Sequence, residues 1–277
     1  MIGRCDIGFR LALVAALLLG AVQAGAQTTS LRELNTQNDA LAWKAVGRLD
    51  MMRSGYCTGT LIAPDLVLTA AHCVYSKADR RLLSPEDITF QAGLTHGTAA
   101  ARRSISQIEA HRGYNPQAAH NGQNIRYDLA LLRLAEPIPT HELSPFAVFP
   151  GLVPRGPVSV VSYGQGRSEA LSRQNSCQVL GSSQKVLALD CDVTFGSSGA
   201  PVFTHINGRG QIASVISGGG QFRGKRAAYG MALPELVSEL KAQMHVNKPR
   251  PRARVRRLGV GENKSSSGAK FVTARAP

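Results

Sequence analysis

CTGTLIAPDLVLTAAHC, residues 57–73, contains two short apolar runs separated by a Pro-Asp pair, with a cysteine at each end. Runs of four to eight residues that are rich in Val, Ile and Leu, and are bounded by Gly, Pro, Asn or Asp, are typical of β-strands. From Trp43 onward the chain repeats this pattern, for example in DLALLRL (128–134), VSVVSYG (158–164), KVLALDCDV (185–193) and APVFTHINGRGQIASVIS (200–217). The pattern predicts an all-β, mainly antiparallel domain, either a barrel or a sandwich.

One later segment has a helical period. In LPELVSELKAQM (233–244), apolar residues recur at spacings of three and four, which places Leu233, Leu236, Val237 and Leu240 on one face of a helix. This segment is expected to close the domain as a C-terminal helix.

The first 26 residues are typical of a signal peptide. Arg4 and Arg10 precede the apolar run LALVAALLLGAV (11–22), and AGA (24–26) supplies small residues where a signal peptidase would cut. The apolar run is short for a membrane span, although an N-terminal anchor is the alternative interpretation. No later segment of the sequence approaches the length of a transmembrane helix. We therefore expect a secreted or periplasmic protein after removal of residues 1–26.

Two further segments flank the strand-rich part of the chain. Residues 27–42 are polar and are expected to form either a propeptide or an arm. Of the formal net charge of +14, the residues from Lys248 onward contribute +8, with nine Lys or Arg against one acidic residue. Residues 247–277 are expected to be a disordered basic tail, either solvated or in contact with an anionic surface or polymer. With only 5% aromatic residues and no recognisable reader module, nucleic-acid binding is not expected as the main function.

Four cysteines remain outside the leader: Cys57, Cys73, Cys177 and Cys191. An even number of cysteines in an exported protein favours two disulfides. Four cysteines allow three connectivities, and proximity in the sequence favours 57–73 and 177–191. A zinc site is the alternative, but none of the four cysteines forms a CxxC pair, so we expect no metal.

The Gly/Ser turn FGSSGAP (195–201) is either an ordinary loop or the site of a nucleophilic serine. A serine hydroxyl needs a neighbouring imidazole to remove its proton, and the imidazole works best when a buried carboxylate orients it. His72 follows an apolar run and two small alanines, and Asp128 begins another apolar run. A carboxylate buried there would require a partner such as an imidazolium.

In this order, the motifs LTAAHC (68–73), DLALLRL (128–134) and GSSGAP (196–201) resemble the three active-site motifs of the chymotrypsin-like serine peptidases. Together with the opening stretch they look most similar to the bacterial branch that includes the glutamyl endopeptidases, over roughly residues 43–243. The resemblance implies two six-stranded antiparallel β-barrels of chymotrypsin type with a C-terminal helix. It also implies a serine peptidase domain over residues 43–246 that cleaves proteins or peptides through an acyl-enzyme and needs no cofactor.

The resemblance assigns roles to individual residues. Ser198 would be the nucleophile, His72 the general base and acid, and Asp128 the group that orients His72. The backbone N–H groups of Gly196 and Ser198 would form the oxyanion hole, and Ser197 would be a spacer. The animal digestive members carry Asp at the position of Ser197, where it binds a newly cut N-terminal amine, so that activation step cannot operate in this chain.

The same resemblance locates the wall of the primary specificity pocket. Ser217, Gly218 and Gly219 are expected to line it, and the glycines would leave it open. The neighbouring residues include no histidine, so strict glutamate preference is not expected. Asp192 has the spacing of the trypsin-type pocket aspartate, but a structural hydrogen bond is the favoured role, and small or medium uncharged side chains are the expected substrates.

The rival interpretation is a catalytically silent homologue that binds a partner through the same cleft or through its tail. The intact set of His72, Asp128 and Ser198 favours the enzyme, and the protein is expected to be a monomer.

Overall fold

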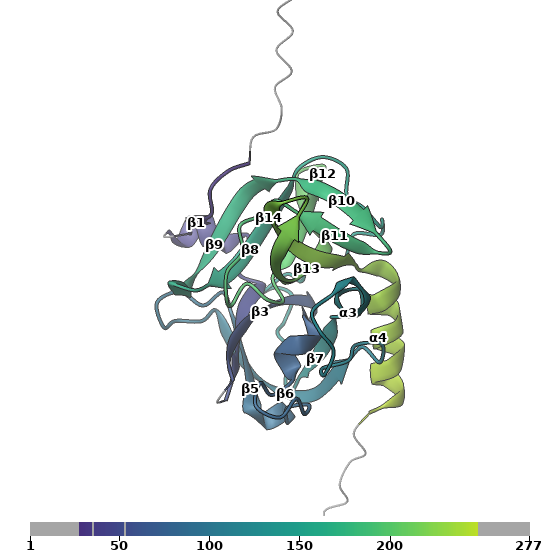
Figure 1. Cartoon of the computed structure of the whole chain (residues 1–277). Coiled ribbons are helices and arrows are strands. Elements are labelled where there is room, and N and C mark those ends of the chain that lie inside the picture. Colours follow the sequence, from purple (N-terminus) through teal and green to yellow (C-terminus); the bar gives the residue numbers. More distant parts are fainter. Residues whose placement is uncertain (1–27, 35, 53, 249–277) are drawn as a thin grey trace, which may run out of the picture.

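The computed structural model describes residues 28–34, 36–52 and 54–248, which form two β-sheet units packed against each other with a helix along one side (Figure 1). The predicted signal peptide (1–26) and the basic tail from residue 249 onward lie outside the described residues. Strands dominate, as the short apolar runs predicted, and the all-β class with a C-terminal helix is confirmed.

The first unit is a closed antiparallel barrel of six strands in the order β2-β3-β4-β7-β6-β5. Its strands are β2 (Val46–Met51), β3 (Gly55–Ala63), β4 (Leu66–Thr69), β5 (Ile88–Ala92), β6 (Ala101–Ala110) and β7 (Ala130–Leu134). Pro64 and Asp65 make the turn between β3 and β4, since proline cannot donate to a strand ladder and favours turns. The opening stretch of the sequence is therefore one hairpin of this barrel.

The second unit is a sheet in the order β1-β9-β8-β12-β13-β14-β11-β10. Its strands are β1 (Arg32–Glu33), β8 (Val158–Gly164), β9 (Arg167–Cys177), β10 (Val179–Ser183), β11 (Val186–Leu189), β12 (Pro201–Ile206), β13 (Arg209–Phe222) and β14 (Lys225–Ala232). Only Gln178 separates β9, which pairs with β8, from β10, which pairs with β11. One nearly continuous segment thus supplies strands near opposite ends of the sheet order. The first unit is the closed six-stranded barrel that the resemblance implied, and the second is an eight-stranded sheet.

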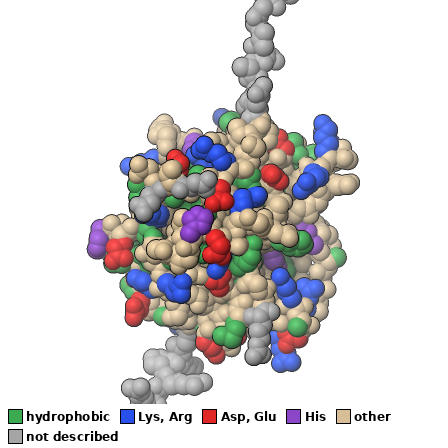
Figure 2. Space-filling view, turned by 90° about the vertical axis from the view of Figure 1, so that its left-hand side faces the viewer, with side chains coloured by type: hydrophobic (Ala, Val, Ile, Leu, Met, Phe, Trp, Pro, Cys, Tyr) green, Lys and Arg blue, Asp and Glu red, His purple; other side chains and the backbone are tan. Residues whose placement is uncertain are grey.

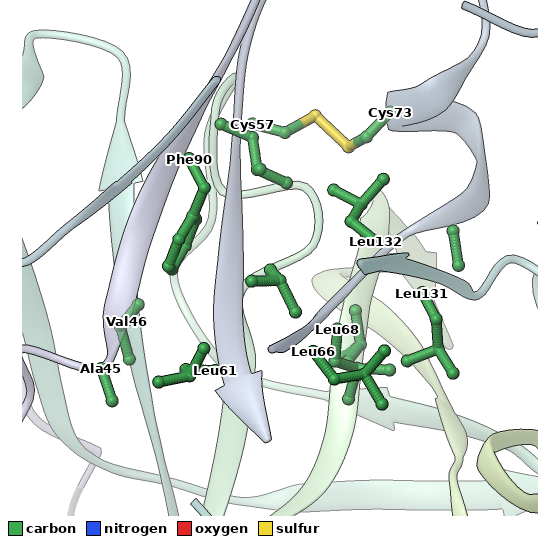
Figure 3. Packing of buried hydrophobic residues seen from close by; sticks show 14 of the residues in the cluster. Ala45, Val46, Cys57, Leu61, Leu66, Leu68, Cys73, Phe90, Leu131 and Leu132 are labelled. Carbon is green, nitrogen blue, oxygen red and sulfur yellow. A yellow bond between two sulfur atoms is a disulfide. The ribbon is translucent and has the colours of Figure 1, made fainter. Parts of the chain in front are cut away.

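The core of the first barrel consists of aliphatic and aromatic side chains from all of its strands (Figure 3). Leu61, Leu68, Phe90 and Leu131 are each fully buried. Burial of one such side chain stabilises the fold by about 1.5–3 kcal/mol. The Cys57–Cys73 disulfide lies at one edge of this core and ties β3 to the segment that follows β4.

Helix α4 (Pro234–Val246) packs along the first barrel against β6 and β7, although it follows the last strand of the second unit. Leu236, Val237 and Leu240 are buried, which confirms the apolar face predicted from their spacing. Gln107 on β6 donates a hydrogen bond to the Met244 carbonyl, at 2.9 Å. The helix therefore ties the end of the chain back to the first barrel.

Residues 28–34 contact the second unit. Arg32 and Glu33 pair as β1 with β9, and Leu34 is 4% exposed. The Thr28 hydroxyl donates to the Asp190 carboxylate at 2.7 Å. The short helix α2 (Gln37–Leu41) then leads into the first barrel.

Figure 2 shows one face of the molecule, on which basic and acidic side chains are interspersed and hydrophobic side chains form only small patches. Within the described ranges, no helix has both the length and the apolar character needed to cross a membrane.

Candidate active site

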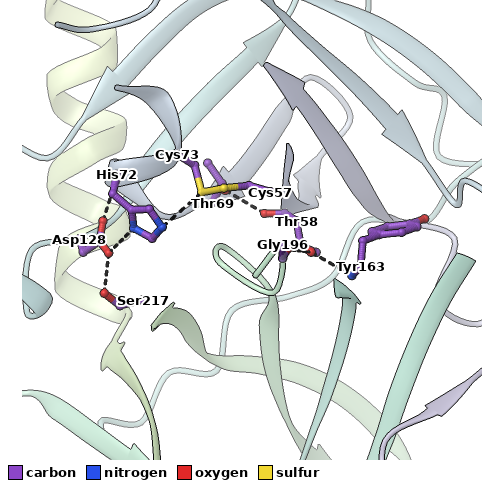
Figure 4. The surroundings of a disulfide bond; sticks show 9 residues. All are labelled: Cys57, Thr58, Thr69, His72, Cys73, Asp128, Tyr163, Gly196 and Ser217. Atoms are coloured by element: carbon purple, nitrogen blue, oxygen red, sulfur yellow. Dashed lines mark hydrogen bonds and ion pairs between the residues drawn. A yellow bond between two sulfur atoms is a disulfide. The ribbon is translucent and has the colours of Figure 1, made fainter. Parts of the chain in front are cut away.

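His72 and Asp128 form a directly hydrogen-bonded pair at the end of the first barrel (Figure 4). His72 lies in the short 3-10 helix η1 (Ala71–Val74) after β4, and Asp128 lies between the short helix α3 (Gly122–Ile125) and β7. Asp128 Oδ2 is 2.7 Å from His72 Nδ1, and Asp128 Oδ1 accepts the His72 backbone N–H at 2.8 Å. Because Nδ1–H donates to the carboxylate, the second ring nitrogen, Nε2, is left as a base.

Burial and charge act in opposite directions on this pair. Burial lowers the pKa of the His72 imidazolium, but the charge and hydrogen bond of Asp128 outweigh it, so the pKa of His72 is raised. Burial likewise raises the pKa of the Asp128 carboxyl, whereas His72 and three hydrogen bonds bring it below its ordinary value. Asp128 is 1% exposed and is therefore a buried carboxylate that stays ionised. Such a pair is suited to taking up a proton at His72.

The two serines of the turn at residues 195–199 lie in different environments. Ser197 is fully buried, and its hydroxyl contacts Ser162 Oγ at 3.2 Å and accepts the Thr194 N–H at 3.3 Å. Ser198 instead lines a pocket of about 450 Å³. Within the described ranges Ser198 Oγ makes no hydrogen bond, and His72 Nε2 lies 3.8 Å from Cys73 Sγ. Catalytic hydrogen bonds are often long before substrate binds.

The same turn contains the two backbone N–H groups that were expected to form the oxyanion hole. Gly196 has a φ of +88°, and an added Cβ would lie 2.2 Å from a Tyr56 ring carbon, so only glycine fits. Gly199 has a φ of +79°, and its missing Cβ lets the turn approach the Thr58 carbonyl. Within the described chain, the N–H groups of Gly196 and Ser198 donate to no acceptor. They therefore have no acceptor that would compete with a bound ligand among the described residues.

Both predicted disulfides are present, Cys57–Cys73 and Cys177–Cys191. The first fixes the residue that follows His72. Cys57, His72 and Cys73 are the one group of His, Cys, Asp or Glu side chains among the described residues that is close enough to share a metal. Both sulfurs are oxidised, so neither can be the thiolate ligand that a zinc site requires.

The pocket beside Ser198 includes the two predicted glycines and several residues that sequence reasoning missed. Its described lining comprises Gln165, Val193, Thr194, Phe195, Ser198, Ile216, Gly218, Gly219 and Arg226. Phe195 is 81% exposed, and Arg226 is exposed and forms no ion pair among the described residues. Phe195 begins the Gly/Ser turn FGSSGAP, and Arg226 lies on β14; no spacing pattern in the sequence pointed to either residue.

Asp192 does not line this pocket. It lies in an adjoining hollow with Asp190 and Arg226, and its side chain is exposed. Its backbone N–H donates to Gln174 Oε1 at 2.7 Å, which agrees with a structural position. The structure therefore does not bring Asp192 to the base of the pocket beside Ser198.

Ser217 was expected to line the pocket, but it is not among the described lining residues; it is buried and contacts Asp128. Its hydroxyl donates to Asp128 Oδ2 at 2.5 Å (Figure 4). His120, from the segment between β6 and β7, lies with Nε2 3.0 Å from Ser217 Oγ. His120 was missed because nothing in its local sequence, QAAHNGQ, marks it as a site residue.

Comparison with known proteins gives consistent results. The sequence profile of the trypsin-like peptidase domain matches residues 57–210. A modular serine protease from Drosophila melanogaster is 36% identical over 33% of this chain and 15% of its own length. A glutamyl endopeptidase from Bacillus licheniformis is 26% identical over 59% of this chain and 50% of its own length.

A solved structure of a Glu endopeptidase in complex with MPD aligns with a TM-score of 0.63 over 77% of this chain and 97% of the other, at 19% identity. At that identity the match shows the shared fold. The chain spans well under two thirds of the first curated relatives that it matches, for example 15% of the Drosophila protease and 29% of a trypsin from Sarcophaga bullata.

Proposed function

Because the chain belongs to the trypsin-like peptidase family, we propose that it is a serine endopeptidase that uses Ser198, His72 and Asp128. One observation carries the proposal: Asp128 Oδ2 lies 2.7 Å from His72 Nδ1, in a molecule whose adjacent pocket contains Ser198. When Nδ1–H of a neutral imidazole donates to this buried carboxylate, Nε2 is left unprotonated. Serine peptidases of this family need this protonation state, in which the imidazole can accept the serine proton.

In the proposed reaction, Ser198 Oγ attacks the carbonyl carbon of the peptide and its proton moves to His72 Nε2. The carbonyl oxygen becomes an oxyanion that accepts hydrogen bonds from the backbone N–H groups of Gly196 and Ser198, which have no acceptor among the described residues. The C–N bond then breaks as His72 returns the proton to the leaving amine, which leaves an acyl ester on Ser198. Water, deprotonated by His72, hydrolyses that ester, and the proton goes back to Ser198.

The charge of the pocket indicates which side chains it accepts. Arg226 is a cation on its wall, and its described lining contains no acidic residue. Lys and Arg side chains would therefore meet a like charge, whereas uncharged side chains fit and acidic ones gain an ion pair. The name of the Bacillus relative, a glutamyl endopeptidase, agrees with the last class. We propose cleavage after acidic or medium uncharged residues, with Arg226 providing the preference for acidic ones.

Export is part of the proposal. The leader-like residues 1–26 and the two disulfides fit a secreted or periplasmic protein, since disulfides persist in oxidising compartments. The basic tail is proposed to contact an anionic surface or polymer, and the protein is proposed to act as a monomer on protein or peptide substrates.

A peptide-library digestion with the full chain and with Ser198→Ala tests the function. The wild type should cleave, and the variant should lose several powers of ten in turnover while it keeps the native fold. Arg226→Gln should lose the preference for Glu and Asp selectively. A folded wild type that cleaves no peptide would support the silent homologue, and strong enrichment of Lys or Arg would exclude the proposed pocket.

A further inference from the structure

We infer that His120 is a positioning residue that acts on the His72–Asp128 pair through Ser217, an inference that rests on the proposed function. The three side chains come from different parts of the fold. His120 lies in the segment between β6 and β7, Ser217 lies on β13 of the second unit, and Asp128 precedes β7 of the first barrel. The chain of contacts therefore joins both units at the site.

The direction of the hydrogen bonds follows from proton counting. Asp128 is ionised and can only accept, so the single hydroxyl proton of Ser217 goes to Asp128 Oδ2. The oxygen of Ser217 can then only accept from His120, at 3.0 Å. His120 must carry its proton on Nε2. The result is a hydrogen-bond relay in which His120 donates to Ser217 and Ser217 donates to Asp128, the carboxylate that also accepts from His72.

A hydroxyl that accepts one hydrogen bond becomes a better donor in the next. His120 therefore strengthens the bond that Ser217 donates and stabilises the negative charge on Asp128. A better-stabilised carboxylate attracts the His72 proton less strongly, so His120 opposes protonation of His72. It also holds the Ser217 hydroxyl in the one orientation that meets the carboxylate.

Gly218 gives an independent sign that the position of His120 is specified. A Cβ built on Gly218 would lie 2.9 Å from His120 Cε1 and 3.0 Å from Nε2. The ring thus rests against the backbone of β13, in the space that any larger residue at 218 would fill. The glycine at 218 and the histidine at 120 are a matched pair.

The titratable groups around the relay are few. Burial lowers the pKa of His120, the charge of Asp128 raises it, and the charge of His72 lowers it. The charge of Lys77 lowers the pKa of His72. Burial and the charge of Asp128 raise the pKa of the nearby Tyr114. Neither Lys77 nor Tyr114 forms a hydrogen bond to the relay among the described residues, so substitution of His120 isolates the relay.

The test follows the protonation of His72 by NMR titration of the full chain, which needs no catalytic activity. His120→Ala should move the His72 titration to higher pH, and His120→Gln, whose amide nitrogen replaces Nε2 as the donor, should restore it. Gly218→Ala should reproduce the His120→Ala shift and add nothing to it in the double variant. His141→Ala, which removes an exposed histidine between β7 and β8, is the matched control and should leave the titration unchanged.

Peptide cleavage supplies the second readout. His120→Ala should lower kcat by about 2- to 10-fold, the net worth of one hydrogen bond, and should move the acidic limb of kcat/KM to higher pH. An unchanged His72 titration in His120→Ala, or no rescue by His120→Gln, would overturn the inference even in an active enzyme. An inactive wild type whose His72 titration responds as described would instead count against the proposed function alone.

Discussion

Removing the two disulfides one at a time should cost similar stability but very different activity. The paired cysteines are separated by 16 residues in Cys57–Cys73 and by 14 in Cys177–Cys191. In the chain-entropy model, loops of these lengths each contribute about 3 kcal/mol to the free energy of unfolding. Both bonds are buried, so replacing either pair with alanine removes a comparable amount of packing. The Cys177→Ala/Cys191→Ala variant is thus a matched control for Cys57→Ala/Cys73→Ala.

The activity should differ because Cys73 follows His72 in η1 and its sulfur lies 3.8 Å from His72 Nε2. Without the bond to β3 this turn loses its covalent anchor, and displacement of a catalytic group by about 1 Å lowers the rate about 100-fold. We therefore expect kcat/KM to fall about 10- to 100-fold in Cys57→Ala/Cys73→Ala and less than about 3-fold in the control.

Urea unfolding can be followed by the fluorescence of Trp43, the single tryptophan, which packs against Phe203 with ring centroids 5.0 Å apart. Peptide cleavage is then measured without urea, under conditions in which both variants are folded. Equal activity losses in the two variants, or a larger loss in the control, would refute the anchoring role of the first disulfide. A stability loss below about 1 kcal/mol in both would refute the loop-entropy estimate.

Asp128→Asn should leave the fold intact and lower kcat about 10⁴-fold, the magnitude known for this triad, since a neutral amide cannot hold His72 with Nε2 unprotonated; steady-state kinetics checks it. Gly196→Ala should lose stability and most activity, because its Cβ would meet Tyr56 at 2.2 Å, and a stable, active variant would contradict the turn geometry. The acidic limb of kcat/KM should lie above pH 6.5, since the pKa of His72 is raised from that ordinary value. The free energy of unfolding should show the opposite pH dependence to activity: the contribution of protonated His72 is fully present below pH 6.5 and is lost as pH rises through the raised pKa.

Much of the site could be predicted because its chemistry is concentrated in short motifs. His72 and Cys73 are adjacent in the sequence, and Gly196, Ser197 and Ser198 are consecutive, so their local settings could be read directly. The disulfide pairs also followed from proximity in the chain. Three barrel strands, β3, β4 and β7, could be recognised because each is a short apolar run bounded by turn residues, whereas β6 (ARRSISQIEA) is largely polar and could not.

The missed residues depend on contacts between distant segments. His120 meets Ser217 across 97 residues, and Arg226 reaches the pocket from β14, where its neighbours in the sequence are unremarkable. The docking of Arg32 and Glu33 on β9 likewise depends on the free edge of a strand that begins 134 residues later in the chain. No local periodicity encodes such contacts. Asp192 illustrates the converse, since its trypsin-like spacing did not bring it to the pocket beside Ser198.

The most direct test is labelling of the full chain with a serine-directed fluorophosphonate, followed by peptide mapping of the modified residue. An activated nucleophile at the pocket should place the label on Ser198, and Ser198→Ala should abolish it. Ser197→Ala should keep the label, because the Ser197 hydroxyl is buried against Ser162 and the Thr194 N–H. Label on Ser197, or a folded wild type that takes up no label, would contradict the assignment of Ser198 as the nucleophile of a serine peptidase.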